Sequence, residues 1–187
     1  MTKRPMDLKS GTAQRTAASP GTIGIRPATE DDLPQIVDIL NYTAANSIAT
    51  FDARAVSVDE RRDWFGEFSL AGPYRLLVAE RGNRVAGYAC SHRYRDHEAF
   101  RETVEVSIAL DAGSRGQGAG TSLYQELFDC LAHEPVHAAV AGIALPNDAS
   151  VALHRKFGFT EIGTFHEYAV KNGRYLSSVW MERLCRP

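Results

Sequence analysis

The fold of this chain is decided by one glycine-rich stretch, Arg115-Gly116-Gln117-Gly118-Ala119-Gly120-Thr121-Ser122. It follows a segment with strand-like alternation, residues 103–110, and opens a segment with helical periodicity, residues 121–133. The first amides of a helix have no partner inside the helix, and glycines leave them open to a ligand. A phosphate group can therefore bind there, helped by the helix dipole. The alternative interpretation is a flexible connection that binds nothing.

Two known phosphate-binding loops do not fit this stretch. The ATP-type loop ends in Gly-Lys-Ser/Thr, and the stretch holds no lysine. The dinucleotide fingerprint GxGxxG fails from Gly116, where Thr121 takes the last position, and from Gly118, where Leu123 does. The pattern that fits is Arg/Gln-x-x-Gly-x-Gly/Ala, over residues 115–120.

A second segment, residues 145–159, has the sequence Leu-Pro-Asn-Asp-Ala-Ser-Val-Ala-Leu-His-Arg-Lys-Phe-Gly-Phe. With these two motifs at this distance, the chain resembles the GNAT superfamily of N-acetyltransferases. The segment Thr103-Val-Glu-Val-Ser107 and its lead-in Ala99-Phe100-Arg101 narrow the resemblance to phosphinothricin N-acetyltransferase-like proteins. The resemblance runs from about Ile23 to Leu184 and implies an enzyme that transfers an acetyl group from acetyl-CoA to an amine.

Composition limits the partners of the chain. Its 187 residues carry 21 Lys and Arg against 23 Asp and Glu, a formal charge of −2, which argues against a dedicated nucleic-acid binder. No stretch approaches the ~18 apolar residues of a membrane helix, so we expect no membrane partner. The three cysteines form no CxxC pair, so neither a zinc site nor a disulfide framework is predicted. These features are typical of a cytoplasmic protein that binds no metal.

The order of segments predicts one α/β domain. Residues 1–22 have too few apolar side chains to form a core, so we predict a disordered N-terminal extension followed by an acetyltransferase domain over 23–187. The element order β-α-α-β-β-β-α-β-α-β-β predicts a mixed, mostly antiparallel central sheet flanked by helices. We expect strands over residues 23–27, 75–80, 84–90, 103–110, 136–145, 160–170 and 174–183, and helices from about 29–31, over 58–68 and 121–133, and from 147 or 148 to near 158.

The resemblance implies a set of acetyl-CoA contacts. Backbone groups of Ile108, Ala109 and Leu110 would meet the pantetheine arm, and Asn147 would bond to it. The pyrophosphate would lie on Arg115, Gly116, Gln117, Gly118, Ala119, Gly120 and Thr121. Ser150 and Lys156 would lie nearby. Two alternatives stay open, because Ser150 could only cap its helix and Lys156 could be a solvated helix residue.

Glu105 is the candidate general base. It shares a strand face with Thr103, Ser107 and Ala109, and burying an ionised carboxylate there without a partner is costly. An amine must lose a proton before it attacks, and a carboxyl whose pKa is raised by partial burial suits that task. The resemblance also places the base of the phosphinothricin-like proteins here. The alternative is a rim glutamate paired with a loop arginine.

His154 stands where the superfamily often has a tyrosine that acts as general acid, so the resemblance implies a catalytic role beside the sulfur. An imidazole with an ordinary pKa near ~6.5 suits either direction of proton transfer. The alternative is a structural histidine packed against the sheet.

On the acceptor side, Arg93, Phe100 and Arg101 mix positive charge with aromatic rings and are candidates to bind an anionic group of the acceptor. Phe51 matches an aromatic residue of the resembling proteins and would line the acceptor pocket. The alternative for the arginine-rich segment is a solvated loop.

The acceptor half departs from the phosphinothricin-like pattern. Glu102 stands in place of a tryptophan, Ala109 in place of a tyrosine, and Leu176-Ser177 in place of His-Asp. Acetylation of phosphinothricin itself therefore does not follow, and we expect a small amino-acid-like primary amine such as methionine sulfoximine. The alternatives are a non-catalytic acyl-CoA-binding module and an acetyltransferase of protein N-termini or lysines. By resemblance, the chain forms a homodimer.

Overall fold

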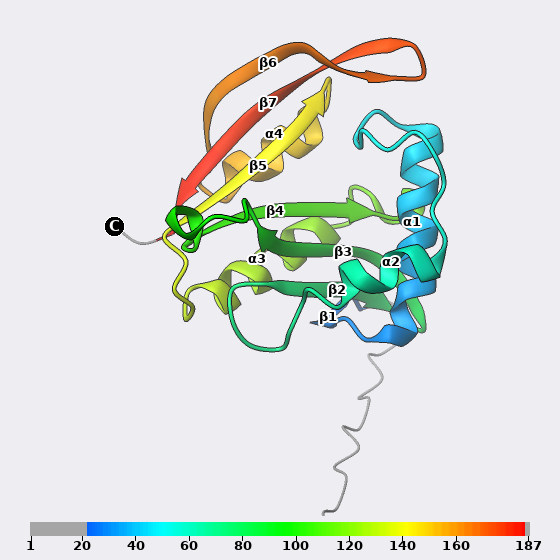
Figure 1. The fold of residues 1–187 in the computed structure, drawn as a ribbon. Helices are drawn as coiled ribbons and strands as arrows, with labels where there is room; N and C mark the ends of the chain where they lie inside the picture. Colours follow the sequence, from blue (N-terminus) through cyan, green and yellow to red (C-terminus); the bar gives the residue numbers. More distant parts are fainter. Residues whose placement is uncertain (1–21, 186–187) are drawn as a thin grey trace, which may run out of the picture.

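The computed structural model describes residues 22–185, and places a seven-stranded sheet in the order β1-β2-β3-β4-β5-β7-β6 (Figure 1). The predicted extension lies, apart from residue 22, outside the described residues. The strands are β1 (Gly24–Pro27), β2 (Arg75–Arg81), β3 (Arg84–Arg93), β4 (Thr103–Leu110), β5 (Ala138–Leu145), β6 (Thr160–Lys171) and β7 (Arg174–Leu184). The helices are α1 (Leu33–Asn46), α2 (Val58–Phe65), α3 (Ala119–Leu131) and α4 (Asp148–Lys156).

This arrangement confirms the predicted element order and the mixed α/β class. Only β4 and β5 pair in parallel, while the other neighbouring strands of the described sheet pair antiparallel. Several boundaries differ from the prediction by a few residues, and two of them have a clear structural reason. The strand expected to end at Cys90 continues to Arg93, because residues 91–93 pair with residues 104–106 of β4. The second helix ends at Phe65 rather than residue 68, where Gly66 donates its amide to the Arg62 carbonyl.

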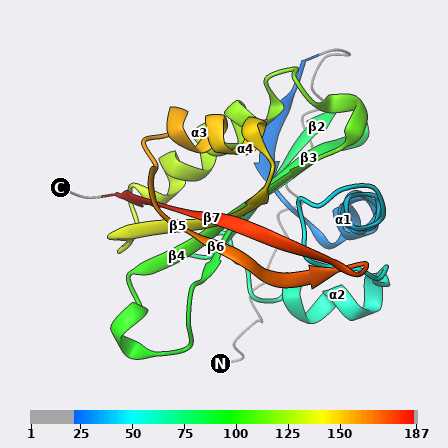
Figure 2. The ribbon, with the colours of Figure 1, turned by 90° about the horizontal axis from the view of Figure 1, so that it is seen from above.

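Helices cover both faces of the sheet. Helices α3 and α4 lie on one face, and α1 and α2 lie on the other (Figure 2). Apolar and polar residues alternate along β4, and Val104 and Val106 are buried in the core under α3. Glu105 and Ser107 therefore face the side of α1 and α2. The packing places the one carboxylate of this strand on a helix-covered face of the sheet.

The sheet divides between β4 and β5. The two strands pair over only three positions, from Thr103 opposite Ala138 to Glu105 opposite Val140. Beyond these positions their described residues do not pair with each other, since β4 stays with β3 and β5 stays with β7. Figure 1 shows β5 (yellow) rising away from β4 (green). The division leaves an opening whose walls carry strand edges without a strand partner.

Candidate active site

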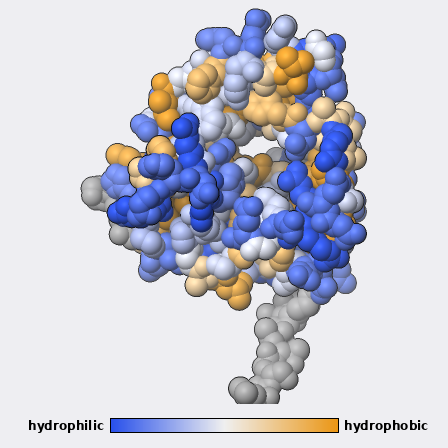
Figure 3. All heavy atoms as spheres, viewed as in Figure 1, coloured by the Kyte–Doolittle hydropathy of each residue, from blue (hydrophilic) through white to orange (hydrophobic). Residues whose placement is uncertain are grey.

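A cleft of about 790 Å³ occupies the division of the sheet. Its walls come from residues 106–110 of β4, residues 141–143 of β5, the glycine loop, the start of α4, and the segment between α1 and α2. Figure 3 shows the molecule hollowed at this place. The cleft is therefore bounded by the two segments that the sequence singled out and by the strand of Glu105.

Most of the predicted acetyl-CoA contacts lie on this cleft. The lining residues among them are Ile108, Ala109, Leu110, Arg115, Gly116, Gly118, Gly120, Thr121, Asn147 and Ser150. Three others are not among the residues that line the cleft. Ala119 is fully buried in the core, and the Gln117 side chain donates to the Gly113 carbonyl and accepts from Arg81. Lys156 stands beside the loop, with its Nζ 3.4 Å from Oγ1 of Thr121.

The glycine loop presents the start of α3 to the cleft. Gly118, the residue before the helix, has a left-handed backbone with φ +87°, and no side chain caps the helix there. Gly120 lies where helix and strand meet closely, because a Cβ atom there would be 3.3 Å from Leu153 Cδ2 and 3.5 Å from Leu110 Cδ1. A cap without a side chain, next to the cationic Arg115, fits a pyrophosphate. The unpaired strand edges nearby fit an amide-bearing arm such as pantetheine.

Asn147 has a structural task at the start of α4. Its Oδ1 accepts a hydrogen bond from the Ser150 amide at 3.2 Å, and so it caps the helix. The expected alternative, that Ser150 caps the helix, is wrong. The Ser150 hydroxyl lies 3.4 Å from Nδ1 of His154. Asn147 and Ser150 both line the cleft.

Glu105 is half-buried on the face of α1 and α2, directly opposite His92 of β3. Burial raises the pKa of its carboxyl, and the nearby charge of His92 works in the opposite direction. Among residues 22–185, no arginine forms an ion pair with it, because Arg93 pairs with Asp96, and Arg101 pairs with Glu98 and Glu102. The rim-glutamate alternative therefore does not describe this residue. Glu105 itself is not among the residues that line the cleft, but its strand neighbours Val106 and Ser107 are, so the carboxyl lies beside the cleft wall.

His154 is 2% exposed and bonded at both ring nitrogens. Its Nδ1 donates to the Ser150 carbonyl at 2.8 Å, since a carbonyl can only accept, and its Nε2 accepts from the Tyr124 hydroxyl at 2.8 Å. Burial lowers the pKa of the imidazole, and the bond to Ser150 partly opposes this. Its ring also packs edge-on against Phe159. His154 is among the residues that line the cleft, but both of its ring nitrogens are already bonded inside the protein, which fits the structural alternative better than a proton donor.

Comparison with known proteins identifies the family. Residues 41–159 match the model of the Acetyltransferase (GNAT) family. The chain belongs to this family. It is 42% identical over 168 residues to a phosphinothricin N-acetyltransferase of Streptomyces coelicolor, covering 88% of this chain and 98% of the relative. It is 35% identical over 158 residues to the L-methionine sulfoximine/L-methionine sulfone acetyltransferase of Salmonella typhimurium, covering 84% and 92%.

The solved structures agree with this assignment. A GNAT superfamily phosphinothricin acetyltransferase from Sinorhizobium meliloti, in complex with acetyl-CoA, superposes with a TM-score of 0.79 at 32% identity, covering 87% of this chain and 88% of that one. The GNAT fold of the chain and its class, an N-acetyltransferase with acetyl-CoA as co-substrate, follow from these matches. In the described part of the chain, no helix is long and apolar enough to span a membrane, and no acidic, His or Cys cluster is placed to hold a metal ion.

None of the predicted acceptor residues of this GNAT domain is among the residues that line the cleft, although Phe51 lies at its edge. Arg93 and Arg101 form their ion pairs with acids of their own loop, and Phe100 packs edge-on against Tyr94 at 5.6 Å. The acids within three residues of each arginine explain this outcome. Phe51 lies on the rim, 39% exposed, between the lining residues 50 and 52. Arg93 and Arg101 therefore belong to a solvated loop, as the alternative interpretation of this segment proposed.

Helix α2 contributes two residues to the cleft that were not predicted from the sequence. Arg61 and Trp64 line the cleft, and the guanidinium of Arg61 lies over the Trp64 ring, 5.8 Å from its centroid. Arg61 also pairs with Asp52 at 3.3 Å, while its Nε is buried without a hydrogen-bond partner. The i, i+3 spacing of Arg61 and Trp64 on a predicted helix is the signal that could have found them. Tyr88, Cys90 and His92 of β3 complete this wall.

The Tyr124→Phe substitution tests whether His154 is structural. It removes the hydroxyl that donates to Nε2 and leaves a buried nitrogen unpaired, so the free energy of unfolding should fall by about 1–3 kcal/mol in urea titrations. The kcat of the folded enzyme should stay unchanged. Tyr175→Phe is the control, because Tyr175 is 69% exposed and should change neither quantity. A tenfold or larger loss of kcat, at about unchanged stability, would instead give His154 a part in proton transfer.

Proposed function

We propose that this GNAT enzyme transfers the acetyl group of acetyl-CoA directly to the primary amine of a small amino-acid-like acceptor, of the phosphinothricin or methionine sulfoximine type. One observation carries the proposal. A single cleft joins the glycine loop and Asn147 at one end to Asp52, Arg61 and Trp64 at the other. Two substrates bound there would meet without a covalent enzyme intermediate. The names of the two curated relatives support the acceptor class.

Acetyl-CoA supplies an acyl carbon activated as a thioester. For its binding we propose the unpaired edge of Ile108–Leu110 and the Asn147 amide group for the pantetheine arm. The backbone amides at the start of α3, together with Arg115 and Lys156, would hold the pyrophosphate. The backbone groups of residues 108–110 are also placed to stabilise negative charge that develops on the acyl oxygen.

Glu105 is the proposed general base. The acceptor arrives as an ammonium ion, and only the neutral amine has a lone pair to attack with. Glu105 takes one proton from the ammonium, directly or through one water, and so frees the lone pair for attack. The nitrogen–carbon bond then forms, the carbon–sulfur bond breaks, and the second proton that the nitrogen loses goes to the sulfur of CoA or to water. The electron pair of the broken bond leaves with the sulfur of CoA. The half-buried position of Glu105, which raises its pKa, supports this role.

Arg61 is the proposed partner of the acid group of the acceptor, in place of Arg93, Phe100 and Arg101. It is a cation on the wall of the cleft, and its Nε lacks a hydrogen-bond partner. Guanidinium groups bind carboxylates and phosphinates through two parallel hydrogen bonds. An amino acid would thus present its carboxylate to Arg61 and its ammonium toward Glu105.

An acceptor panel tests the proposed function. With acetyl-CoA, we expect acetylation of methionine sulfoximine, methionine sulfone or phosphinothricin, and loss of at least about 1 kcal/mol of acceptor binding when the α-carboxylate is replaced by a carboxamide. Acetyl-CoA alone should raise the melting temperature. Stabilisation by acetyl-CoA with no transfer to any amino-acid-like amine would contradict the proposal and favour a binding module.

The Glu105→Gln substitution tests the base. We expect kcat to fall by about 10²–10⁴-fold while acetyl-CoA still raises the melting temperature. In the parent enzyme, kcat/KM should rise as the pH passes the raised pKa of Glu105, because the base acts only when it is ionised. The Glu105→Gln variant should not show this rise. A carboxyl with a raised pKa stabilises the fold below its unfolded pKa and loses that contribution as pH rises, so the variant should stay folded at neutral pH.

Glu102→Gln is the matched control for this experiment. Glu102 precedes the same strand, is exposed, and pairs with Arg101 outside the cleft. Its loss should leave kcat and the pH profile unchanged. Unchanged turnover in Glu105→Gln would remove Glu105 from the mechanism.

We also propose that the enzyme is a cytoplasmic homodimer. Cys90 and Cys130 are free thiols, which suits a reducing compartment. The edge strand β6 and its neighbour β7 expose large apolar side chains, namely Ile162 (56%), Phe165 (56%), Val170 (61%), Tyr175 (69%) and Leu184 (63%). Such a surface is typical of a protein interface. Light scattering should give twice the mass of one chain, and a monomer at micromolar concentration would contradict this assembly.

A further inference from the structure

The hairpin of β6 and β7 reaches across the cleft to the segment between α1 and α2. Residues 47–52 of that segment, here called the acceptor loop, contribute Ser47, Ile48, Ala49, Thr50 and Asp52 to the wall of the cleft. Lys171, the last residue of β6, is only 5% exposed. Its Nζ donates to the carbonyl of Ser47 at 2.7 Å and to that of Thr50 at 2.9 Å. Two segments more than a hundred residues apart are thus joined through one side chain.

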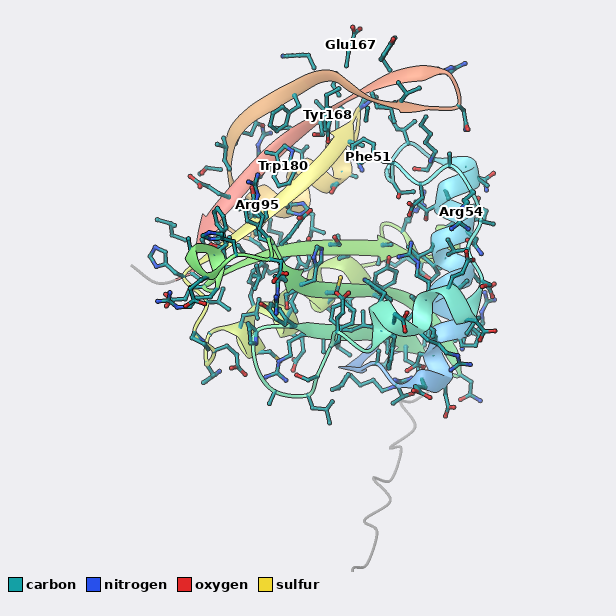
Figure 4. The ribbon with its side chains drawn as sticks, viewed as in Figure 1. Phe51, Arg54, Arg95, Glu167, Tyr168 and Trp180 are labelled. Atoms are coloured by element: carbon teal, nitrogen blue, oxygen red, sulfur yellow. The ribbon has the colours of Figure 1, made fainter. Side chains whose placement is uncertain are left out.

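A second contact joins the same two segments. The ring of Phe51 in the acceptor loop meets the ring of Tyr168 edge-on, with centroids 5.7 Å apart. Figure 4 shows the two rings facing each other between the loop and the hairpin. The Tyr168 hydroxyl accepts a hydrogen bond of 3.0 Å from Ser178 on β7. Tyr168 is therefore held from its own hairpin while its ring contacts the loop.

An irregularity in β6 accompanies this contact. The register with β7 shifts between Phe165 and Ala169, and Glu167 has a left-handed backbone with φ +49°. The Glu167 amide donates to Oγ of Ser177 at 3.0 Å. Bulges of this kind redirect side chains, and a left-handed non-glycine residue is costly unless its surroundings hold it. Tyr168, the residue whose ring meets Phe51, lies within this bulge.

The contacts of Lys171 with the acceptor loop account for the burial of its side chain. Burying an ammonium group is unfavourable unless hydrogen bonds replace its water, and both of its described bonds go to loop carbonyls. Arg174, directly opposite on β7, stays exposed. A lysine that only ended a solvated hairpin would be exposed in the same way. The bonds to Ser47 and Thr50 therefore explain why this cation is buried.

We propose that Tyr168 and Lys171 form a hairpin clamp that positions the acceptor loop for amine binding. The hairpin is continuous with β5, since β7 pairs with β5 from Ala138 to Leu145. The clamp thus ties the acceptor loop to the half of the sheet that carries Asn147 and the cofactor end of the cleft. Lys171 is a positioning residue that does not touch the reacting atoms. The role of the clamp in amine binding rests on the proposed function, whereas its contacts with the loop do not.

The Lys171→Met substitution tests the clamp by two readouts. We expect the KM for the amine to rise about tenfold, as the loss of two hydrogen bonds to the loop predicts, with the KM for acetyl-CoA and kcat little changed. Trypsin should also cleave faster after Arg54, which lies just beyond the loop with a side chain that is 73% exposed. The cleavage rate is independent of catalysis, and mass spectrometry identifies the site.

Two further variants complete the design. Arg174→Met removes a cation from the same hairpin without touching the loop, so it should leave both readouts unchanged. Lys171→Arg keeps a donor that can reach carbonyl groups and should restore part of the acceptor affinity. If Lys171→Met does not fold, Tyr168→Ala replaces it and should give the same pair of changes.

The outcomes separate the clamp from the proposed function. A folded Lys171→Met enzyme with the KM for the amine and the cleavage rate of the parent would overturn the clamp. Equal effects of Lys171→Met and Arg174→Met would also overturn it. If the parent acetylates no amine, the proposed function fails, and the rate of cleavage after Arg54 still decides whether the clamp holds the loop.

Discussion

The structure depends on the parting of β4 and β5 after three paired positions. Each strand has a complete antiparallel partner on its other side, β3 for β4 and β7 for β5, so each half of the sheet is stable without the missing pairs. Trp180 of β7 packs closely over Gly142 of β5, where a Cβ atom would lie 3.1 Å from the indole ring. The strand edges that the parting leaves open become the walls of the cleft.

Several contacts between helices and strands hold the walls of this cleft in place. Gly120 allows α3 to approach β4 and α4, which brings the start of the helix to the opening. The bond between His154 and Tyr124 fixes α4 on α3, and so it holds Asn147 at the cleft. The proposed hairpin clamp holds the acceptor end of the cleft in the same way. The cofactor end is thus built by local motifs, whereas the acceptor end depends on contacts between distant segments.

This difference explains how much the sequence could predict. Alternation placed Glu105 on the opposite face of β4 from Val104 and Val106, and the structure places it there. Asn172-Gly173, between the expected strands 160–170 and 174–183, is a typical hairpin turn pair, and both residues have positive φ. These signals are local, because glycine, turn residues and two-residue periodicity act within a few positions.

The acceptor side could not be predicted in the same way. Arg93 and Arg101 drew attention as cations near aromatics, but nearby acids neutralise them outside the cleft. Arg61 and Lys171 acquire their surroundings from tertiary packing, and the partners of Lys171 lie 121 and 124 residues away. The hydrogen bond that defines His154 comes from Tyr124, 30 residues earlier. Long-range partners of this kind leave no periodic signal in one sequence.

A crystal structure of the enzyme with acetyl-CoA would show whether the divided sheet binds the co-substrate. We expect the pantetheine arm between β4 and β5, bonded to the backbone of residues 108–110, with the pyrophosphate on residues 116–121 and the thioester on the side of Glu105. Acetyl-CoA bound outside the divided sheet, or β4 and β5 paired along their whole length in the complex, would contradict this expectation.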